Sequence, residues 1–445
     1  MSTSINPAHA ISRFGSTSSC RKEEALEVNV PAGWQRTSLG DILSLKNGFA
    51  FSSDFFCDSG PILLTPGNFR LDGGLHFDDR NTKRYRGPYD PKMTFEQGDL
   101  LIVMTDLTPD CNLLGRPAVV HSDELILHNQ RIGKVILRDR STDRKFLFYL
   151  LLSRPYLDHV KEMATGSTVR HTSNKTIYGI PVLLPSPVEQ RAIAAALSDV
   201  DRLINALDKI IAKNRTIKLA AMQQLLTGKT RLTGFTAKWR HTKLGQLGTT
   251  YGGLTGKNKA DFGSGTARYI PFLNIMNNVV IDASYLGSVR VSESESQNAA
   301  KVGDLFFNGS SETPEEVGMC AVLLQEIHDV YLNSFCFGFR LNNGSDENGL
   351  YLAYFFRSGE GRQLLYSLAQ GATRYNLSKT SLLKLEFRIP PPEEQTAIAT
   401  VLSDIDAEIA ALEQRRDKTK AIKQGMAQVL LTGRSRLVKP EVVPA

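Results

Sequence analysis

The chain has 445 residues, 41% hydrophobic and 22% charged, which is typical of a soluble protein large enough for more than one core. Its formal net charge of +7 permits binding to a polyanion without establishing it. The five cysteines are odd in number and never spaced Cys-x-x-Cys, which argues against a disulfide framework or a zinc site and fits a reducing cytosol. They are Cys20, Cys57, Cys111, Cys320 and Cys336.

The first residues carry no hydrophobic targeting segment, and no apolar run approaches the roughly 18 residues that a membrane helix needs. We therefore expect a cytoplasmic protein with no membrane span. Residues 1–32 are rich in small and polar side chains and are predicted to be a mobile extension.

An internal repeat with an offset of 205 residues organises the rest of the chain. Segment 185–232 aligns without a gap on segment 390–437, with 24 of 48 positions identical. The same offset pairs the only two tryptophans, Trp34 and Trp239. Two large copies of one unit indicate a pseudo-dimer rather than a solenoid.

Each copy is predicted to be an α+β domain with a mostly β body. Apolar runs bounded by Gly, Pro and Asn predict strands, a longer apolar stretch predicts a helix, and a polar loop then leads into a last strand that ends in proline. The expected strands are 61–69, 98–105 and 132–137 in the first copy and 269–281, 303–308 and 336–341 in the second. The expected helices are 146–164 and 351–369.

The repeated segment itself is predicted to be a long helix. Pro187 and Pro392 suit its first turn, where the missing amide hydrogen does no harm, and Gly228 and Gly433 suit its end. Apolar residues recur in steps of three and four, which is typical of a coiled-coil seam. We expect the two helices to pack antiparallel as a rod of roughly 57 Å. The predicted seam is Ile193, Leu197, Val200, Ile204, Leu207 and Ile211, with Ile398, Leu402, Ile405, Ile409 and Leu412.

No catalytic or cofactor motif is recognisable in the sequence. The glycines of 262–267 lack the pattern of a dinucleotide site and predict a turn, and no phosphate-binding loop, zinc-protease helix or serine-hydrolase elbow occurs. Asp199 and Asp201, like their repeats Asp404 and Asp406, lie two apart on a helix and are predicted to be solvated rather than paired. We expect no catalytic residue, metal or cofactor on this chain.

Basic, aromatic and amide side chains gather instead in the loops of the two β-rich domains. Such side chains read base edges and hold phosphates, although a solvated loop is the ordinary alternative for any one cluster. The helices repeat at half identity while the loops hardly align, which suggests two different targets. The candidate DNA-binding residues are Lys83, Arg84, Tyr85, Arg86, Gln130, Arg131, Arg170, Lys175, Lys257, Lys259, Arg268, Tyr269, Arg374 and Tyr375.

The repeated helix, with its opening Pro-x-Pro-x-Glu-Gln-x-Ala-Ile-Ala and closing Leu-Leu-Thr-Gly-x-x-Arg-Leu, resembles that of type I restriction-modification specificity subunits over residues 33–437. The resemblance implies two target-recognition domains that read the two halves of a split asymmetric site in double-stranded DNA. It also implies a non-catalytic subunit of a bacterial or archaeal complex. Its helices would dock two adenine-N6 methyltransferase subunits carrying S-adenosylmethionine, and restriction subunits would supply ATP- and Mg²⁺-dependent cleavage.

The corresponding segments are an extension at 1–32, recognition domains at 33–184 and 237–389, repeated helices at 185–236 and 390–437, and a tail at 438–445. An alternative reading is a coiled-coil adaptor whose paired domains bind proteins or glycans. Salt separates the two, because DNA affinity falls steeply with ionic strength whereas binding through an apolar surface does not.

Overall fold

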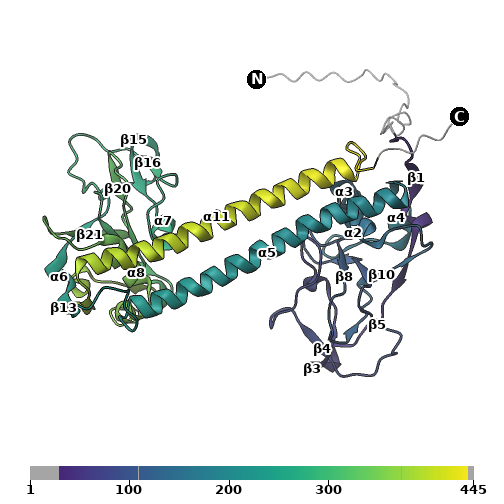
Figure 1. The fold of residues 1–445 in the computed structure, drawn as a ribbon, viewed down its shortest axis with the longest axis horizontal. Coiled ribbons are helices and arrows are strands. Elements are labelled where there is room, and N and C mark those ends of the chain that lie inside the picture. The colour runs from purple at the N-terminus through teal and green to yellow at the C-terminus, as the bar shows by residue number, and fades with distance from the viewer. Residues whose placement is uncertain (1–29, 109, 372, 439–445) are drawn as a thin grey trace, which may run out of the picture. The chain divides into compact units, whose positions relative to one another are not determined.

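The structure is a computed structural model that describes residues 30–108, 110–371 and 373–438 (Figure 1). It divides into two compact units, unit 1 within Met1–Ile204 and Thr419–Ala445, and unit 2 within Asn205–Lys418. Each unit therefore holds one β-rich domain, the start of the long helix that follows it in sequence, and the end of the long helix from the other repeat. Within the described ranges, no helix is long and apolar enough to cross a membrane.

Unit 1 contains two four-stranded sheets. The first is antiparallel, in the order β2 (Leu43–Asn47), β10 (Ile132–Leu137), β6 (Leu100–Val103) and β8 (Pro117–Val119). The second has the order β4 (Lys83–Tyr85), β3 (Phe56–Leu63), β9 (Ile126–Leu127) and β5 (Thr94–Phe95), with β3 and β9 parallel.

Strand β6 shows where the core of unit 1 lies. All four of its residues are buried, with Leu100 and Ile102 in one apolar cluster and Leu101 and Val103 in another. Because successive side chains of a strand point to opposite faces, the sheet has a core on each side.

Short elements complete the domain of unit 1. They are the strand pairs β1 (Gln35–Ser38) with β12 (Pro181–Leu184) and β7 (Thr105–Asp106) with β11 (Arg170–His171), and the helices α1 (Leu39–Ile42), α2 (Arg144–Leu152), α3 (Arg154–Glu162) and α4 (Asn174–Tyr178).

Unit 2 repeats this plan. Its main sheet has the order β14 (Gly248–Gly252), β21 (Cys336–Leu341), β17 (Leu305–Asn308) and β19 (Cys320–Val322), and its second sheet β16 (Gly287–Val289), β15 (Phe262–Ile270) and β20 (Val330–Leu332). The strand pairs are β13 (Arg240–Lys243) with β23 (Glu386–Ile389) and β18 (Ser310–Ser311) with β22 (Tyr375–Asn376). The helices are α6 (Leu244–Leu247), α7 (Phe272–Asn277), α8 (Gly349–Arg357), α9 (Gly359–Tyr366) and α10 (Lys379–Leu383).

Several predicted elements are wrong in their extent. The strand expected at 269–281 ends at Ile270, because Pro271 has no amide hydrogen to continue the ladder and stands at the N-cap of α7. The strand expected at 61–69 ends at Leu63, before a 3₁₀ turn. Each single helix expected after the sheet is two helices, α2 with α3 and α8 with α9, broken at Ser153 and Ser358.

The long helices are α5 (Pro187–Leu225) and α11 (Pro392–Leu430), and both begin at the predicted proline. Gly228 and Gly433 follow the last turn with φ of +69°, a left-handed conformation that favours glycine, as predicted. Residues 1–29 of the predicted extension and residues 439–445 of the tail lie outside the described residues.

Within each unit, ion pairs join α5 to α11 in antiparallel order. In unit 2, Lys218 Nζ lies 2.6 Å from Asp406 Oδ1 and Arg416 Nη1 lies 3.6 Å from Asp208 Oδ1, so residue numbers rise on one helix as they fall on the other. In unit 1, Lys423 pairs with Asp201 at 2.6 Å and Arg436, just beyond α11, pairs with Glu189, so the order is again antiparallel. A continuous coiled coil over the full helix length stays a prediction.

The predicted seam residues do not all do the same thing. Ile193 and Leu197 pack in a cluster that contains the unit 1 domain core and residues at the end of α11, and Ile398 and Leu402 pack in a cluster that contains the unit 2 domain core and residues at the end of α5, so a domain contact adds to the predicted seam. The remaining buried members are Ile204, Leu207, Ile211 and Ile409. Val200, Ile405 and Leu412 are only half-buried.

Candidate nucleic-acid interface

A buried ion pair ties the start of α5 to the chain just beyond α11 in unit 1. Glu189 is 1% exposed, and its two carboxylate oxygens accept hydrogen bonds from Nε and Nη2 of Arg436 at 2.5 and 2.7 Å. Trp34 Nε1 also donates to Glu189 at 2.9 Å, and Arg436 donates to the backbone oxygen of Ala32 at 2.8 Å. The planar guanidinium suits this two-point contact, which fixes orientation as well as distance.

The same joint occurs in unit 2, between the start of α11 and the chain just beyond α5. Glu394 is fully buried, accepts from Arg231 Nη2 at 2.5 Å and also from its Nε, and accepts from Trp239 Nε1 at 3.2 Å. All three residues are the 205-offset repeats of the unit 1 set. Each glutamate near the start of a long helix is therefore the buried partner of an arginine and a tryptophan.

The next residue of each motif attaches the long helix to the domain. Gln190 Oε1 accepts from the backbone nitrogen of Asp143 at 2.8 Å, and Gln395 Oε1 accepts from that of Asn348 at 3.0 Å. Each of these nitrogens lies just before a domain helix, so the repeated Glu-Gln dipeptide sets how the long helix leaves its domain.

Two of the four repeated aspartates, Asp201 and Asp406, are half-buried and accept a hydrogen bond from a tyrosine, which corrects the prediction of a solvated face for these two, whereas Asp199 and Asp404 are exposed. Asp201 accepts from the Tyr149 hydroxyl at 2.8 Å and pairs with Lys423. Burial, with the Asp201 carboxylate, raises the pKa of the Tyr149 hydroxyl, so it remains a proton donor. Tyr354 and Asp406 make the same bond at 2.7 Å in unit 2.

Three segments of unit 1 meet around one backbone position. The Met104 nitrogen donates to the Arg131 carbonyl at 2.8 Å, and the Met104 carbonyl accepts from Thr172 at 3.1 Å. The strand pair β7–β11 then places Arg170 opposite Asp106. We call the turn at 129–131 and the strand pair β7–β11 together the reading surface of unit 1. It brings together Arg131 and Arg170, which the sequence predicted in separate loops.

The polar side chains of this surface are partly free. Gln130, Arg131 and His171 are exposed. Arg170 is half-buried and donates from Nη1 to the Gly166 carbonyl at 3.0 Å, while its Nε is buried with no hydrogen-bond partner among the described residues. A buried donor without a partner favours an added acceptor, such as a phosphate or base oxygen.

Unit 2 has the equivalent reading surface. Gly309 N donates to the Phe335 carbonyl at 3.0 Å, the Gly309 carbonyl accepts from Leu377 at 2.9 Å, and β18 pairs with β22. Arg374 is exposed and its guanidinium lies 5.9 Å from the centre of the Phe335 ring. Phe335 is 59% exposed, yet the sequence did not single it out. An aromatic residue in the polar turn Asn-Ser-Phe-Cys was the available signal.

Other candidate DNA contacts are occupied elsewhere. Tyr85 is 3% exposed and packs in an apolar cluster, so its prediction as a DNA contact is wrong. Arg84 pairs with Glu124 at 2.7 Å, and Arg86 donates to a serine hydroxyl. The Lys257 side chain is 6% exposed and pairs with Glu295 at 2.5 Å, so it is not free to meet a phosphate.

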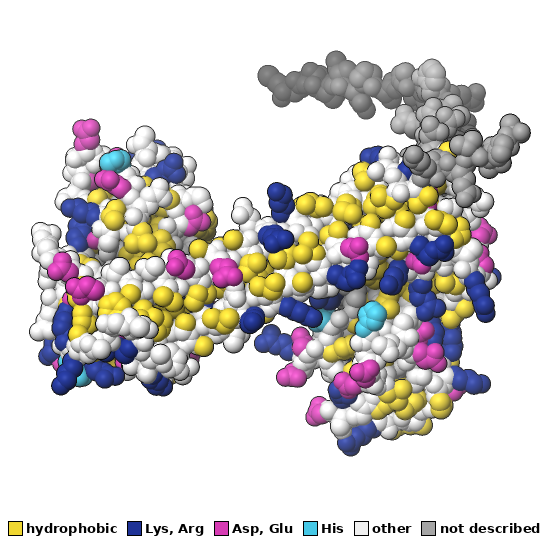
Figure 2. Space-filling model, viewed as in Figure 1, with side chains coloured by type: hydrophobic (Ala, Val, Ile, Leu, Met, Phe, Trp, Pro, Cys, Tyr) yellow, Lys and Arg dark blue, Asp and Glu magenta, His cyan; other side chains and the backbone are white. Residues whose placement is uncertain are grey.

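The other candidate DNA-binding residues stay predictions. Lys83, Lys175, Lys259 and Arg268 are exposed. Tyr269 and Tyr375 are half-buried against apolar neighbours. On the face drawn in Figure 2, Lys and Arg side chains occur on both units among Asp and Glu, so charge alone does not mark the interface.

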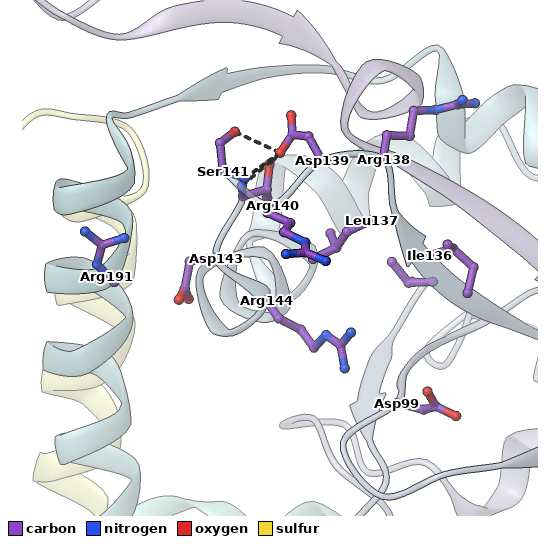
Figure 3. A pocket seen from close by; sticks show the side chains of 12 residues that line it. Asp99, Ile136, Leu137, Arg138, Asp139, Arg140, Ser141, Asp143, Arg144 and Arg191 are labelled. Atoms are coloured by element: carbon purple, nitrogen blue, oxygen red, sulfur yellow. Dashed lines mark hydrogen bonds between the residues drawn. The ribbon is translucent and has the colours of Figure 1, made fainter.

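A polar pocket of about 590 Å³ lies where the unit 1 domain meets the start of α5 (Figure 3). Arg140 and Arg144 come from the loop after β10 and the start of α2, and Arg191 comes from α5. Asp139 is engaged by Ser141, which lowers the pKa of its carboxyl. A hollow at the same place in unit 2 is lined by Arg240, Asp346 and Glu347, so it has fewer basic side chains than the pocket of unit 1.

Among the described residues, no group of three His, Cys, Asp or Glu could hold a metal. Burial raises the pKa of Cys336 to about 12, so this thiol is protonated near neutral pH. His128 is buried against Phe95, and its Nε2 lies 2.9 Å from the Ile132 carbonyl, so its ring packs in the domain. His121 is exposed, and Cys20 lies outside the described residues.

The family described as the type I restriction modification DNA specificity domain matches the chain twice, over residues 31–218 and 237–423. The chain belongs to this family. The two matches correspond to the two copies of the 205-residue repeat, and each includes a β-rich domain and most of the helix that follows it.

Individual relatives agree with this assignment. The type I restriction enzyme MjaVIII specificity subunit of Methanocaldococcus jannaschii is 26% identical over 225 residues, 48% of this chain and 50% of that protein. The EcoBI specificity subunit of Escherichia coli is 27% identical over 231 residues, 48% of this chain and 44% of that protein. The alignments thus span about half the length of these relatives.

Solved structures share the fold over most of the chain. The type I restriction-modification S subunit from M. genitalium has a TM-score of 0.53 and 13% identity, covering 90% of this chain and 96% of its own. A chain from a structure on the assembly and conformational transition of the type I R-M system has a TM-score of 0.56 and 16% identity, covering 91% and 99%.

Proposed function

We propose that this chain is the DNA-specificity subunit of a type I restriction-modification complex. The recognition domain of unit 1 reads one half of a split asymmetric site in double-stranded DNA, and that of unit 2 reads the other half. The observation that carries the proposal is the pair of reading surfaces. They are built from the same backbone contacts in a chain that matches the specificity-domain family twice.

The same backbone with different side chains is what two related readers of different sequences require. Unit 1 presents Gln130, Arg131 and Arg170, whereas unit 2 presents Phe335 and Arg374 on the equivalent segments. Guanidinium and amide groups can pair with base edges in the major groove, and apolar groups can contact the thymine methyl.

The proposal assigns catalysis to other subunits. The helices α5 and α11 would dock two adenine-N6 methyltransferase subunits, which carry S-adenosylmethionine, and restriction subunits would add ATP- and Mg²⁺-dependent cleavage. The names of the relatives, which are specificity subunits of restriction enzymes, support this division of labour and a cytoplasmic place of action.

Binding measured by fluorescence anisotropy, with the chain in complex with its methyltransferase subunits, tests the proposal. We expect one asymmetric bipartite duplex to bind far more tightly than a scrambled duplex. We also expect the logarithm of affinity to fall linearly with the logarithm of salt concentration. Equal affinity for all duplexes, or affinity independent of salt, would contradict the proposal.

The purified chain alone, assayed with S-adenosylmethionine or with ATP and Mg²⁺, is expected to show no methyl transfer and no cleavage. Activity that persists after partner subunits have been removed by stringent purification would show that the chain is itself an enzyme.

A further inference from the structure

A single turn, at 129–131, precedes β10, an inner strand of the antiparallel sheet of unit 1. Asn129 shapes it: its side-chain oxygen accepts from the Arg131 nitrogen at 3.1 Å, and its carbonyl accepts from Ile132 at 3.0 Å. The Arg131 carbonyl accepts from Met104 at 2.8 Å. Its three hydrogen bonds use backbone groups and one asparagine, so the side chain at the tip, Arg131, is not needed to hold the turn.

The turn before β21, the equivalent strand of unit 2, has the same three hydrogen bonds. The Asn333 side chain accepts from the Phe335 nitrogen at 2.9 Å, its carbonyl accepts from Cys336 at 3.1 Å, and the Phe335 carbonyl accepts from Gly309 at 3.0 Å. Phe335 therefore occupies the place of Arg131. Here the offset between the copies is 204 residues, whereas the 205-residue offset of the helices pairs Phe335 with Gln130 and hides the equivalence.

Phe335 is placed as a contact group rather than as part of the core. It is 59% exposed, and Arg374 from the same reading surface lies over its ring at 5.9 Å. The other aromatic residues near it on β21, Phe337 and Phe339, are buried. A rigid turn that presents a large apolar side chain to solvent exposes area that binding can bury.

We propose that this tip position reads one base in each half-site, with Arg131 selecting guanine in one half and Phe335 selecting thymine in the other. The inference rests on the proposed function and specifies its chemistry. Arginine can donate two hydrogen bonds to guanine O6 and N7, and an aromatic ring can contact the C5-methyl group that distinguishes thymine in the major groove.

The expected effects differ in size. A two-bond arginine–guanine contact corresponds to a roughly 5- to 150-fold preference over another base. Burial of one methyl group corresponds to a roughly fourfold preference. Arg131→Ala should therefore cause the larger loss, at one base position of one half-site only.

The test uses the chain in complex with its methyltransferase subunits and duplexes carrying the site found by methylation sequencing. Each base pair is varied in turn, and each thymine is replaced by uracil, which lacks only the methyl group. We expect one uracil substitution to weaken binding by the original complex about fourfold. The same substitution should not change the affinity of the complex that carries Phe335→Ala. Phe335→Arg should turn the preference at that position toward guanine.

Matched variants separate this role from folding. Tyr366 is 52% exposed on α9 of the same unit, and Arg154 is 91% exposed on α3 of unit 1, so Tyr366→Ala and Arg154→Ala should leave base preferences unchanged. Phe335→Leu keeps an apolar side chain and should retain part of the thymine preference if the methyl contact is real. Each variant is compared at equal folded fraction, measured by circular dichroism.

Sequence-specific binding with base preferences unchanged by Arg131→Ala and Phe335→Ala would overturn this inference and leave the proposed function standing. Loss of methyltransferase binding by Phe335→Ala, with base preference kept, would identify Phe335 as a subunit contact and would also overturn it. If the original complex binds no sequence preferentially, the proposed function fails first.

Discussion

The joint between Glu189 and Arg436 should contribute strongly to the stability of unit 1. Arg436→Met removes both hydrogen bonds to a carboxylate that is 1% exposed, and keeps most of the apolar side-chain volume. Removing one partner of a buried ion pair leaves a charge without compensation, which costs about 3–5 kcal/mol. We therefore expect the folded-to-unfolded ratio of unit 1 to fall by at least roughly 100-fold.

The chain offers a direct optical reporter for this measurement. Trp34 donates to Glu189 itself, and the only other tryptophan is Trp239 in unit 2. In a Trp239→Phe background, tryptophan fluorescence during urea unfolding reports unit 1 alone. The free energy of unfolding is obtained by linear extrapolation for the background protein and for Arg436→Met.

An exposed ion pair supplies the control. Arg202 and Asp199 have side chains that are 77% and 61% exposed, so Arg202→Met should cost less than about 1 kcal/mol. The double variant Glu189→Leu with Arg436→Met removes both charges and should recover part of the loss. It leaves Trp34 Nε1 without its acceptor, at a cost of about 1–3 kcal/mol. An Arg436→Met loss no larger than that of Arg202→Met would refute the reasoning.

Three further outcomes are expected. Leu207→Asp places a charge at a position that is 3% exposed and should cost several kcal/mol in thermal unfolding, whereas Leu203→Asp, at a position that is 41% exposed, should change stability by less than about 0.5 kcal/mol. Burial lowers the pKa of His128, so the unfolded chain takes up the proton more readily. The contribution of His128 to the free energy of unfolding of unit 1 should be fully present above about pH 6.5 and should be lost as the pH falls below it. His128→Leu, which introduces the residue type of the equivalent Leu332, should reduce this pH dependence in urea titrations. Exchange of residues 33–184 for a relative's domain should change one half of the methylated sequence and leave the other half and the spacing, read by methylation sequencing, unaltered; a change in both halves would contradict independent reading.

Local chemistry was readable from the sequence at several positions where one residue decides the backbone, although the end of a strand at Pro271 was missed. Pro187 and Pro392 begin the long helices, Gly228 and Gly433 take the left-handed conformation after them, and the strand at 336–341 has its predicted bounds. Proline restricts the backbone dihedral φ and glycine tolerates positive φ regardless of tertiary context, so such predictions need no knowledge of neighbours.

Contacts between distant segments were not readable in the same way. The identity of Glu189 with Glu394, and of Arg436 with its repeat, is visible in the sequence, but nothing local says that a helix start meets the end of the other copy's helix. Arg84 and Lys257 look like free cations until the fold supplies their acidic partners. Side-chain availability depends on packing, which composition and spacing do not contain.

The contrast between the joints and the reading turns follows from what each must hold. A joint depends on its side chains: Glu189 without Arg436 is an uncompensated buried charge, so a change at one member destabilises the unit. A turn depends on its backbone and one asparagine, so Arg131 and Phe335 can occupy the same place without a change in its hydrogen bonds. Base preference can therefore vary at the tip with little effect on stability, which is the property that a scaffold for many DNA sequences needs.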